Sequence, residues 1–235
     1  MAVVLVFIAC LVPSLIFFFW LRSRNKDKPE YVKTCNRALF SGMFSSIPII
    51  LSALVLNLIG VLAGLKKMHW IVWGCFETFV LYALTEELFK FLFSIRVLKK
   101  TECEYSWYDV TAFMTLVGIG FGLFESIPYA FTLGMIEAVI RGFILGHGVY
   151  GFIMGYFYAK ALNTGKKGYF VLSFAIPYIF HALYDFSLIP QLTEYNDDLA
   201  IIAVLLALAD LVVMIIMIVF FARRRRNEKY TKPLL

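Results

Sequence analysis

Four consecutive apolar stretches in the middle of the chain carry ionisable side chains of types that bind metals or transfer protons. In chain order these are Glu86, Glu87 and Lys90, then Glu125, then His147, and finally His181 with Asp185. A charged side chain at the centre of a bilayer costs about 2.5–3.5 kcal/mol on insertion scales, and it usually persists only where it serves a function. The pattern therefore indicates a polar reaction site inside a membrane protein.

The motif Glu86-Glu87-x-x-Lys90 places the lysine one helical turn from both glutamates. The glutamates point about 100° apart on a helix, so we expect at most one of them to face a given site squarely. Adjacent carboxylates in a low dielectric resist ionising together, so one is expected to be protonated or neutralised by Lys90. One glutamate would then activate water while the other orients it or pairs with Lys90; the alternative is a salt bridge that only ties helices together. Asp210 is also placed within an apolar stretch, and a partnership with Lys90 is one possibility.

His181 and Asp185 lie four residues apart, on one face of a helix. The carboxylate can hold one imidazole nitrogen and leave the other for a metal, a water or a developing oxyanion. Glu125 and His147 are weaker signals individually, because a lone His in a glycine-rich helix often hydrogen-bonds a neighbouring carbonyl. Small-xxx-small glycine pairs in both of their segments predict a close approach that brings these two residues together.

The sequence contains no G-x-S-x-G, H-E-x-x-H or Walker motif. A hydrolytic site would therefore use the carboxylates and histidines. Two glutamates and two histidines dispersed in this way would suit a zinc-type site of mixed nitrogen and oxygen ligands with an open position. The same residue types would equally suit a metal-free Glu/His pair that activates water. Two other classes compete: a proton- or ion-coupled transporter, disfavoured because no convincing inverted repeat relates the two halves, and a non-catalytic scaffold.

The composition places the chain among membrane proteins. Its 235 residues are 61% hydrophobic, with a mean hydropathy of +0.81, whereas soluble domains are roughly 45–50% apolar. Apolar windows long enough to cross a bilayer fall at about 3–21, 39–64, 70–97, 110–133, 135–162, 168–189 and 199–221. We predict an all-α integral membrane protein, a bundle of about seven transmembrane helices. It would form a single transmembrane domain over 1–235, with the motifs at about 80–190 and a basic cytoplasmic tail at 222–235.

The basic residues predict how the helices are oriented. They follow the first, third, fifth and seventh windows, at Arg22 to Arg37, Lys99 and Lys100, Lys166 and Lys167, and Arg223 to Arg226. The positive-inside rule then places the N-terminus outside and the C-terminus in the cytoplasm. The first window precedes its positive charges, the reverse of a signal peptide, so we expect a retained helix. At a rise of about 1.5 Å per residue, the four motifs fall within roughly 6 Å of one another in depth.

Read together, the motifs resemble those of a known family in order, spacing and flanking residues. They read Glu86-Glu87-Leu-Phe-Lys90, Phe121-Gly-Leu-Phe-Glu125, His147-Gly-Val-Tyr-Gly-Phe-Ile-Met-Gly155 and His181-Ala-Leu-Tyr-Asp185-Phe186. This is similar to the PrsW family of intramembrane proteases, in the clan that also holds the CAAX prenyl endopeptidases and a gamma-secretase scaffold subunit. The resemblance covers about residues 80–190. The glutamate at position 125 stands where CAAX enzymes carry histidine, which puts in doubt a mechanism borrowed directly from them.

The resemblance implies an endopeptidase that cuts a membrane-anchored protein, typically an anti-sigma factor near its extracytoplasmic side. The implied catalytic residues are Glu86, Glu87, Lys90, Glu125, His147, His181 and Asp185. Glu86 is the first choice for activating water, with Glu87 and Lys90 tuning it. If the site uses a metal, zinc is the expected ion and Glu125, His147 and His181 the expected ligands. The expected partners are a single-span substrate and the lipid bilayer, with no nucleic acid, and the expected location is the bacterial plasma membrane, as a multi-pass protein.

Overall fold

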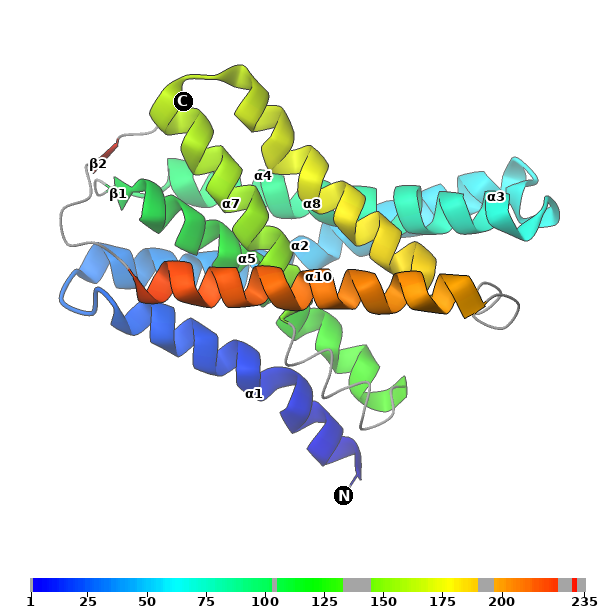
Figure 1. Cartoon of the computed structure of the whole chain (residues 1–235), viewed down its shortest axis with the longest axis horizontal. Helices are drawn as coiled ribbons and strands as arrows, with labels where there is room; N and C mark the ends of the chain where they lie inside the picture. The colour runs from blue at the N-terminus through cyan, green and yellow to red at the C-terminus, as the bar shows by residue number, and fades with distance from the viewer. Residues whose placement is uncertain (1, 103–104, 133–144, 190–196, 224–229, 232–235) are drawn as a thin grey trace.

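The computed structural model describes residues 2–102, 105–132, 145–189, 197–223 and 230–231, and most of them are helical (Figure 1). The elements are α1 (Ala2–Ser23), α2 (Pro29–Leu62), η1 (Leu65–Lys67), α3 (Trp70–Cys75), η2 (Phe76–Leu84), α4 (Thr85–Lys99), β1 (Tyr105–Ser106), α5 (Trp107–Thr132), α7 (Gly146–Thr164), α8 (Lys167–Ser187), α10 (Asp197–Ala222) and β2 (Tyr230–Thr231). The predicted helical class is confirmed.

Within the described residues, five helices are long and apolar enough to cross a membrane. These segments are Val4–Ser23, Pro29–Leu62, Trp107–Pro128, Lys167–Ser187 and Val204–Ala222. The window expected at 70–97 corresponds to the run from α3 through η2 to α4, which carries the charged motif. The window expected at 135–162 lies partly outside the described residues, which resume at Leu145. The chain is therefore a multi-pass helical membrane protein, and the number of seven spans stays a prediction.

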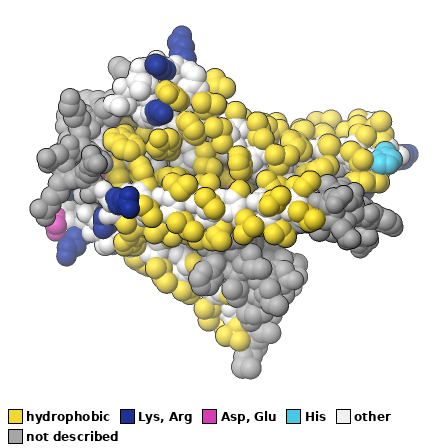
Figure 2. All heavy atoms as spheres, in the orientation of Figure 1, with side chains coloured by type: hydrophobic (Ala, Val, Ile, Leu, Met, Phe, Trp, Pro, Cys, Tyr) yellow, Lys and Arg dark blue, Asp and Glu magenta, His cyan; other side chains and the backbone are white. Residues whose placement is uncertain are grey.

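The outer surface of the bundle is strongly apolar. Side chains such as Leu54, Leu58 and Leu62 of α2 are 59% or more exposed. Figure 2 shows hydrophobic side chains over α10, α8 and α1, with Lys and Arg side chains near the helix ends. A large apolar surface of this kind is unfavourable in water but matches the hydrocarbon core of a bilayer. The apolar surface thus supports the membrane location that the composition indicates.

Helices α5 and α7 pack against each other at the centre of the bundle, and glycines determine how closely. A Cβ added at Gly118 would lie 2.0 Å from the carbonyl oxygen of His147, and one at Gly151 would lie 2.7 Å from that of Met114. Real Cβ atoms essentially never come that close to another heavy atom, so the helices could not approach this way with alanine at either position. Small residues at helix interfaces allow such close contact in membranes. The packing predicted from the glycine pairs is confirmed.

A π-helical segment, η2, directly precedes the Glu86-Glu87 pair. It is continuous with α3 and α4, so the three form one long element (Figure 1). Thr85 directly follows η2, and its hydroxyl donates to the carbonyl oxygens of Leu81 and Tyr82. π-Helical turns inside α-helices frequently occur at functional sites.

The predicted tail at 222–235 is described only at Ala222, Arg223 and residues 230–231; its other residues lie outside the described part of the chain. The short strand β2 pairs antiparallel with β1, so that Tyr105 lies opposite Thr231. This pairing puts residues 230–231 beside the start of α5.

Candidate active site

The side chain of Lys90 lies at the centre of a buried polar network contributed by α4, α7, α8 and α5. Its Nζ atom is 2.6 Å from Glu87 Oε1, 3.5 Å from Glu86 Oε2 and 3.0 Å from His147 Nδ1. The i,i+3 and i,i+4 spacing of the motif thus brings Lys90 to both glutamates, as the sequence predicted. The expectation that at most one glutamate faces the site is wrong, because the long lysine side chain lies between the two carboxylates and both reach it.

Glu87 is the most enclosed member of the network, with no exposed surface. Its Oε1 atom contacts Lys90 and also lies 2.9 Å from His181 Nδ1. A buried carboxylate is tolerated when it is paired and hydrogen-bonded. Glu87 therefore fixes Lys90 of α4 against His181 of α8, and so holds the two helices in register.

His181 has carboxylates against both ring nitrogens. Nδ1 faces Glu87, while Nε2 is 3.2 Å from Asp185 Oδ2 and 3.8 Å from Glu86 Oε2. The expected pairing of His181 with Asp185 on one helix face is confirmed. The aromatic ring of Tyr150 stacks on the imidazole, with ring centroids 4.9 Å apart and an interplanar angle of 23°. These contacts fix the orientation of the imidazole ring.

His147 lies in the first turn of α7 and bridges two parts of the network. Its Nδ1 faces Lys90 and Glu86, whereas its Nε2 is 2.5 Å from Glu125 Oε2. The edge of its ring meets Phe121, with centroids 4.7 Å apart. Glu125 and Glu86 therefore lie on opposite sides of the same imidazole. The structure brings together all seven residues singled out from the motifs.

Three ligand atoms in this network are arranged to suit a metal ion. Glu86 Oε2 is 3.8 Å from both His147 Nδ1 and His181 Nε2, and the three residues each offer a ligand atom within 4.8 Å of the other two. Ligands about 2.0–2.1 Å from a tetrahedral zinc ion are roughly 3.3 Å apart, so a small contraction would enclose an ion. Glu86 Oε2 is buried and makes no hydrogen bond. Two nitrogens and a carboxylate oxygen therefore fit a zinc-type site.

This set differs from the expected ligands in its carboxylate. The sequence suggested Glu125 beside the two histidines, but Glu125 contacts the nitrogen of His147 that faces away from His181 and Glu86. Glu86 takes the place between the two histidines. Sequence spacing could not separate these alternatives, because the choice depends on which ring nitrogen faces which helix.

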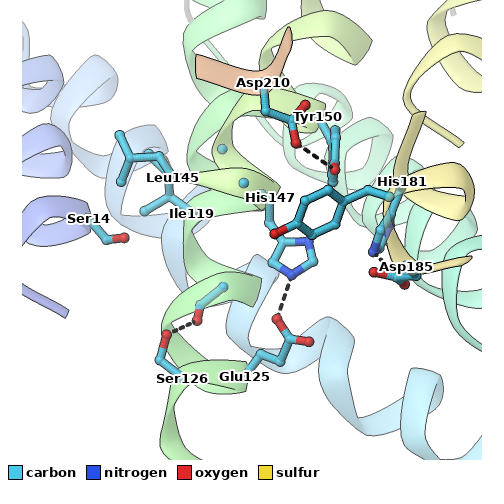
Figure 3. A pocket seen from close by; sticks show the side chains of 15 residues that line it. Ser14, Ile119, Glu125, Ser126, Leu145, His147, Tyr150, His181, Asp185 and Asp210 are labelled. Atoms are coloured by element: carbon cyan, nitrogen blue, oxygen red, sulfur yellow. Dashed lines mark hydrogen bonds and ion pairs between the residues drawn. The ribbon is translucent and has the colours of Figure 1, made fainter. Parts of the chain in front are cut away.

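A small cavity borders the network, and Figure 3 shows the side chains around it. Glu125, His147, His181 and Asp185 line it, together with Ser14 of α1. Its volume is about 60 Å³. A single water needs about 10–15 Å³ by this measure, so the cavity has room for a few water molecules. Water could therefore reach the ionisable groups.

Tyr150 and Asp210 also belong to this site, although the motifs did not identify them. The Tyr150 hydroxyl donates to Asp210 Oδ2 over 3.1 Å, and Asp210 of α10 lines the cavity (Figure 3). The suggested pairing of Asp210 with Lys90 is therefore corrected: Asp210 bonds to Tyr150, and Lys90 bonds to residues of α4 and α7. The available signal was that Asp210 is an ionisable residue within an apolar window, like the other site residues.

Comparison with known proteins points to the same family that the motifs resemble. Residues 32–224 match the family described as PrsW family intramembrane metalloprotease. The Protease PrsW of Clostridioides difficile (strain 630) is 27% identical over 194 residues, which cover 77% of this chain and 78% of that protein. The Protease PrsW of Geobacillus kaustophilus (strain HTA426) is 27% identical over 183 residues, 76% of each chain. The Protease PrsW of Oceanobacillus iheyensis is 33% identical over 116 residues, 48% of this chain and 54% of that one. No solved structure matches the chain.

Proposed function

The chain belongs to the PrsW family of intramembrane metalloproteases, and we propose that it cuts a membrane-anchored protein with the groups assembled around Glu86, His147 and His181. The observation that carries the proposal is their convergence beside a cavity that admits water. Hydrolysis of a peptide bond needs one water and one base held near a single point. A proton-coupled transporter would instead need ionisable groups strung along a path, and the clustering disfavours it.

We assign Glu86 as the general base that accepts the proton of the attacking water. Its Oε2 atom is buried, has no hydrogen-bond partner and lies between the two histidines. A water held there would be within hydrogen-bond reach of the carboxylate. As the water oxygen bonds to the peptide carbonyl carbon, its proton passes to Glu86. The oxyanion that forms lies beside the positive charge of Lys90, which favours it.

Glu125 and His147 are suited to complete the reaction. Glu125 lines the cavity and is hydrogen-bonded to His147. His147 Nδ1 in turn faces Glu86. When the C–N bond breaks, the leaving nitrogen needs a proton, and the Glu125–His147 pair can deliver it from the cavity side. The proton taken up by Glu86 then passes to the imidazole of His147 and reprotonates the Glu125–His147 pair. Glu87 and Asp185 act by holding Lys90 and His181 in place.

Glu86, His147 and His181 are also the residues that would hold a metal ion. When bound, a divalent ion supplies Lewis acidity, polarising the scissile carbonyl and the attacking water. Lys90 and Asp185 lie 3.0 and 3.2 Å from ring nitrogens of His147 and His181. These contacts would compete with a metal for the histidines, so the metal affinity should depend on both residues.

We infer seven spans, with the N-terminus outside and the C-terminus in the cytoplasm of a bacterial plasma membrane; the bacterial relatives and the basic residues near helix ends support this. The inferred substrate is a single-span protein of the anti-sigma factor type. Because the cavity holds only a few waters, such a substrate must present an extended segment rather than a folded domain.

The test is co-expression of the chain with single-span proteins that carry a different epitope at each end. Two complementary fragments should appear, and mass spectrometry should place the cut within or next to the apolar segment. A Glu77→Gln variant is a matched control, because Glu77 lies in η2, outside the network, and contacts Tyr82. Fragments that persist in Glu86→Gln would assign the cleavage to another protease of the host.

A further inference from the structure

A second hollow lies between α1 and α10, next to the catalytic cavity. It encloses about 510 Å³ and has an almost entirely apolar lining, which includes Val12 and Ile16 of α1, Met214 and Ile218 of α10, and Leu145. Both helices are candidate membrane spans. The hollow therefore lies within the bilayer, where only an apolar occupant is favourable.

The hollow has the form of a wedge, closed at one end. Arg24 of α1 donates to the carbonyl oxygens of Phe221 and Ala222, over 3.2 and 3.1 Å. The rings of Phe17 and Phe221 meet beside this contact, with centroids 5.9 Å apart. Towards the N-terminus α1 diverges from α10, as Figure 1 shows. The wedge is thus closed near the basic end of both helices, and the two helices move apart towards the N-terminus of α1.

Among the described residues, Leu145 is the one that lines both the wedge and the catalytic cavity. It precedes α7 in a left-handed backbone conformation, with φ 52° and ψ 35°, which leucine adopts rarely. His147 follows two positions later and faces the catalytic carboxylates. Ser14 of α1 also lines the catalytic cavity, so α1 contributes to the lining of both the cavity and the wedge.

We propose that the wedge between α1 and α10 is the lateral entrance for the transmembrane helix of the substrate, with Leu145 as the partition that the scissile segment passes. This rests on the proposed protease function and adds the route of entry. A helix about 10 Å across fills roughly 420 Å³ per turn, so the wedge seats about one turn. The cavity of about 60 Å³ cannot hold a helix, so the substrate must unwind where it leaves the wedge.

The first arm of the test fills the wedge. Ile218→Trp places a large ring in it, whereas Ile216→Trp makes the same change on the opposite face of α10, where Ile216 is 53% exposed. We expect the first variant to cleave a doubly tagged single-span protein about tenfold or more slowly, and the second to cleave it like wild type. Ile218→Ala widens the wedge and should retain cleavage, which separates blocking from loss of the isoleucine. Equal rates for both tryptophan variants would overturn the proposal.

The second arm detects the occupant directly and does not need turnover. A photo-crosslinking amino acid is placed at position 218 or 216 in the Glu86→Gln chain, and the same doubly tagged protein is the probe. We expect a crosslink to its apolar segment from 218 and little from 216. Crosslinks from 218 to lipid alone would overturn the entrance, even if the wild-type chain cuts the probe. A crosslink from 218 without any cleavage by wild type would instead overturn the protease function and leave the helix-binding wedge in place.

Discussion

Glu125 and His147 are 22 positions apart, yet Oε2 of one lies 2.5 Å from Nε2 of the other. The contact depends on the backbone packing of α5 against α7 rather than on the two side chains alone. Gly118 lies on α5 directly beneath the carbonyl of His147, where any larger residue would collide with it. The position of a catalytic candidate is therefore set by a residue with no side chain.

This dependence predicts the effect of Gly118→Ala. The added methyl group would meet the His147 carbonyl at 2.0 Å, so α7 must shift. We expect cleavage to fall strongly and stability to drop by about 1–3 kcal/mol, as is typical of overpacking. Gly168→Ala is the control, because nothing lies within 4 Å of a Cβ there. Thermal unfolding in detergent and the cleavage assay would measure both effects; equal behaviour of the two variants would contradict the packing argument.

A second prediction concerns the buried ion pair of Lys90 and Glu87. Lys90→Met removes the cation and leaves a fully buried carboxylate facing His181 alone. Removing one partner of a buried pair typically costs about 3–5 kcal/mol. The double variant Lys90→Met with Glu87→Gln should recover part of that loss, because the carboxylate that lies closest to the lysine is neutralised as well. Lys33→Met, at an exposed pair with Glu30, should have little effect.

Titration of unfolding with a denaturing detergent would measure these stabilities. A double variant no more stable than Lys90→Met would mean that the lysine stabilises the fold by packing and not by charge.

A third prediction concerns Asp210 and Tyr150. Asp210→Asn keeps an oxygen that can accept from the Tyr150 hydroxyl, so it should affect cleavage much less than Glu86→Gln. Tyr150→Phe keeps the ring that stacks on His181, whereas Tyr150→Ala removes it. We expect the alanine variant to lose clearly more activity than the phenylalanine variant. Steady-state cleavage rates would show this order; the reverse order would indicate that the hydroxyl takes part in the chemistry itself.

A fourth prediction concerns the metal. If Glu86, His147 and His181 hold an ion, a chelator should abolish cleavage and zinc should restore it. Zinc binding measured by calorimetry should weaken in His181→Ala and remain in Glu77→Gln. Cleavage that resists chelation would contradict the metal site and favour the metal-free Glu/His mechanism.

The sequence predicted the convergence of the site because each of the four segments carried an ionisable group at a similar depth. It also predicted the pairings within one helix, such as His181 with Asp185, since these depend only on residue spacing. It could not predict that Glu86, rather than Glu125, lies between the histidines. That outcome depends on the rotation of α4 and α7, and a π-helical segment changes the rotation of α4.

Contacts between helices distant in sequence were the least predictable. The bond between Tyr150 and Asp210 joins α7 to α10, and nothing in local spacing indicates it. The wedge between α1 and α10 likewise arises from the angle between two uniformly apolar helices. Both windows were recognised as membrane spans, but their hydrophobicity carries no information about which faces meet.

The most direct test of the central claim is cleavage by the purified chain in liposomes with a doubly tagged single-span protein. Glu86→Gln and Glu77→Gln are compared with wild type in the same preparation, with folding checked by circular dichroism. We predict that Glu86→Gln lowers the rate by about 10²-fold or more, because the amide cannot accept a proton, while Glu77→Gln cleaves at the wild-type rate. Cleavage by Glu86→Gln at the wild-type rate, or Glu86-dependent ion flux without proteolysis, would contradict the account.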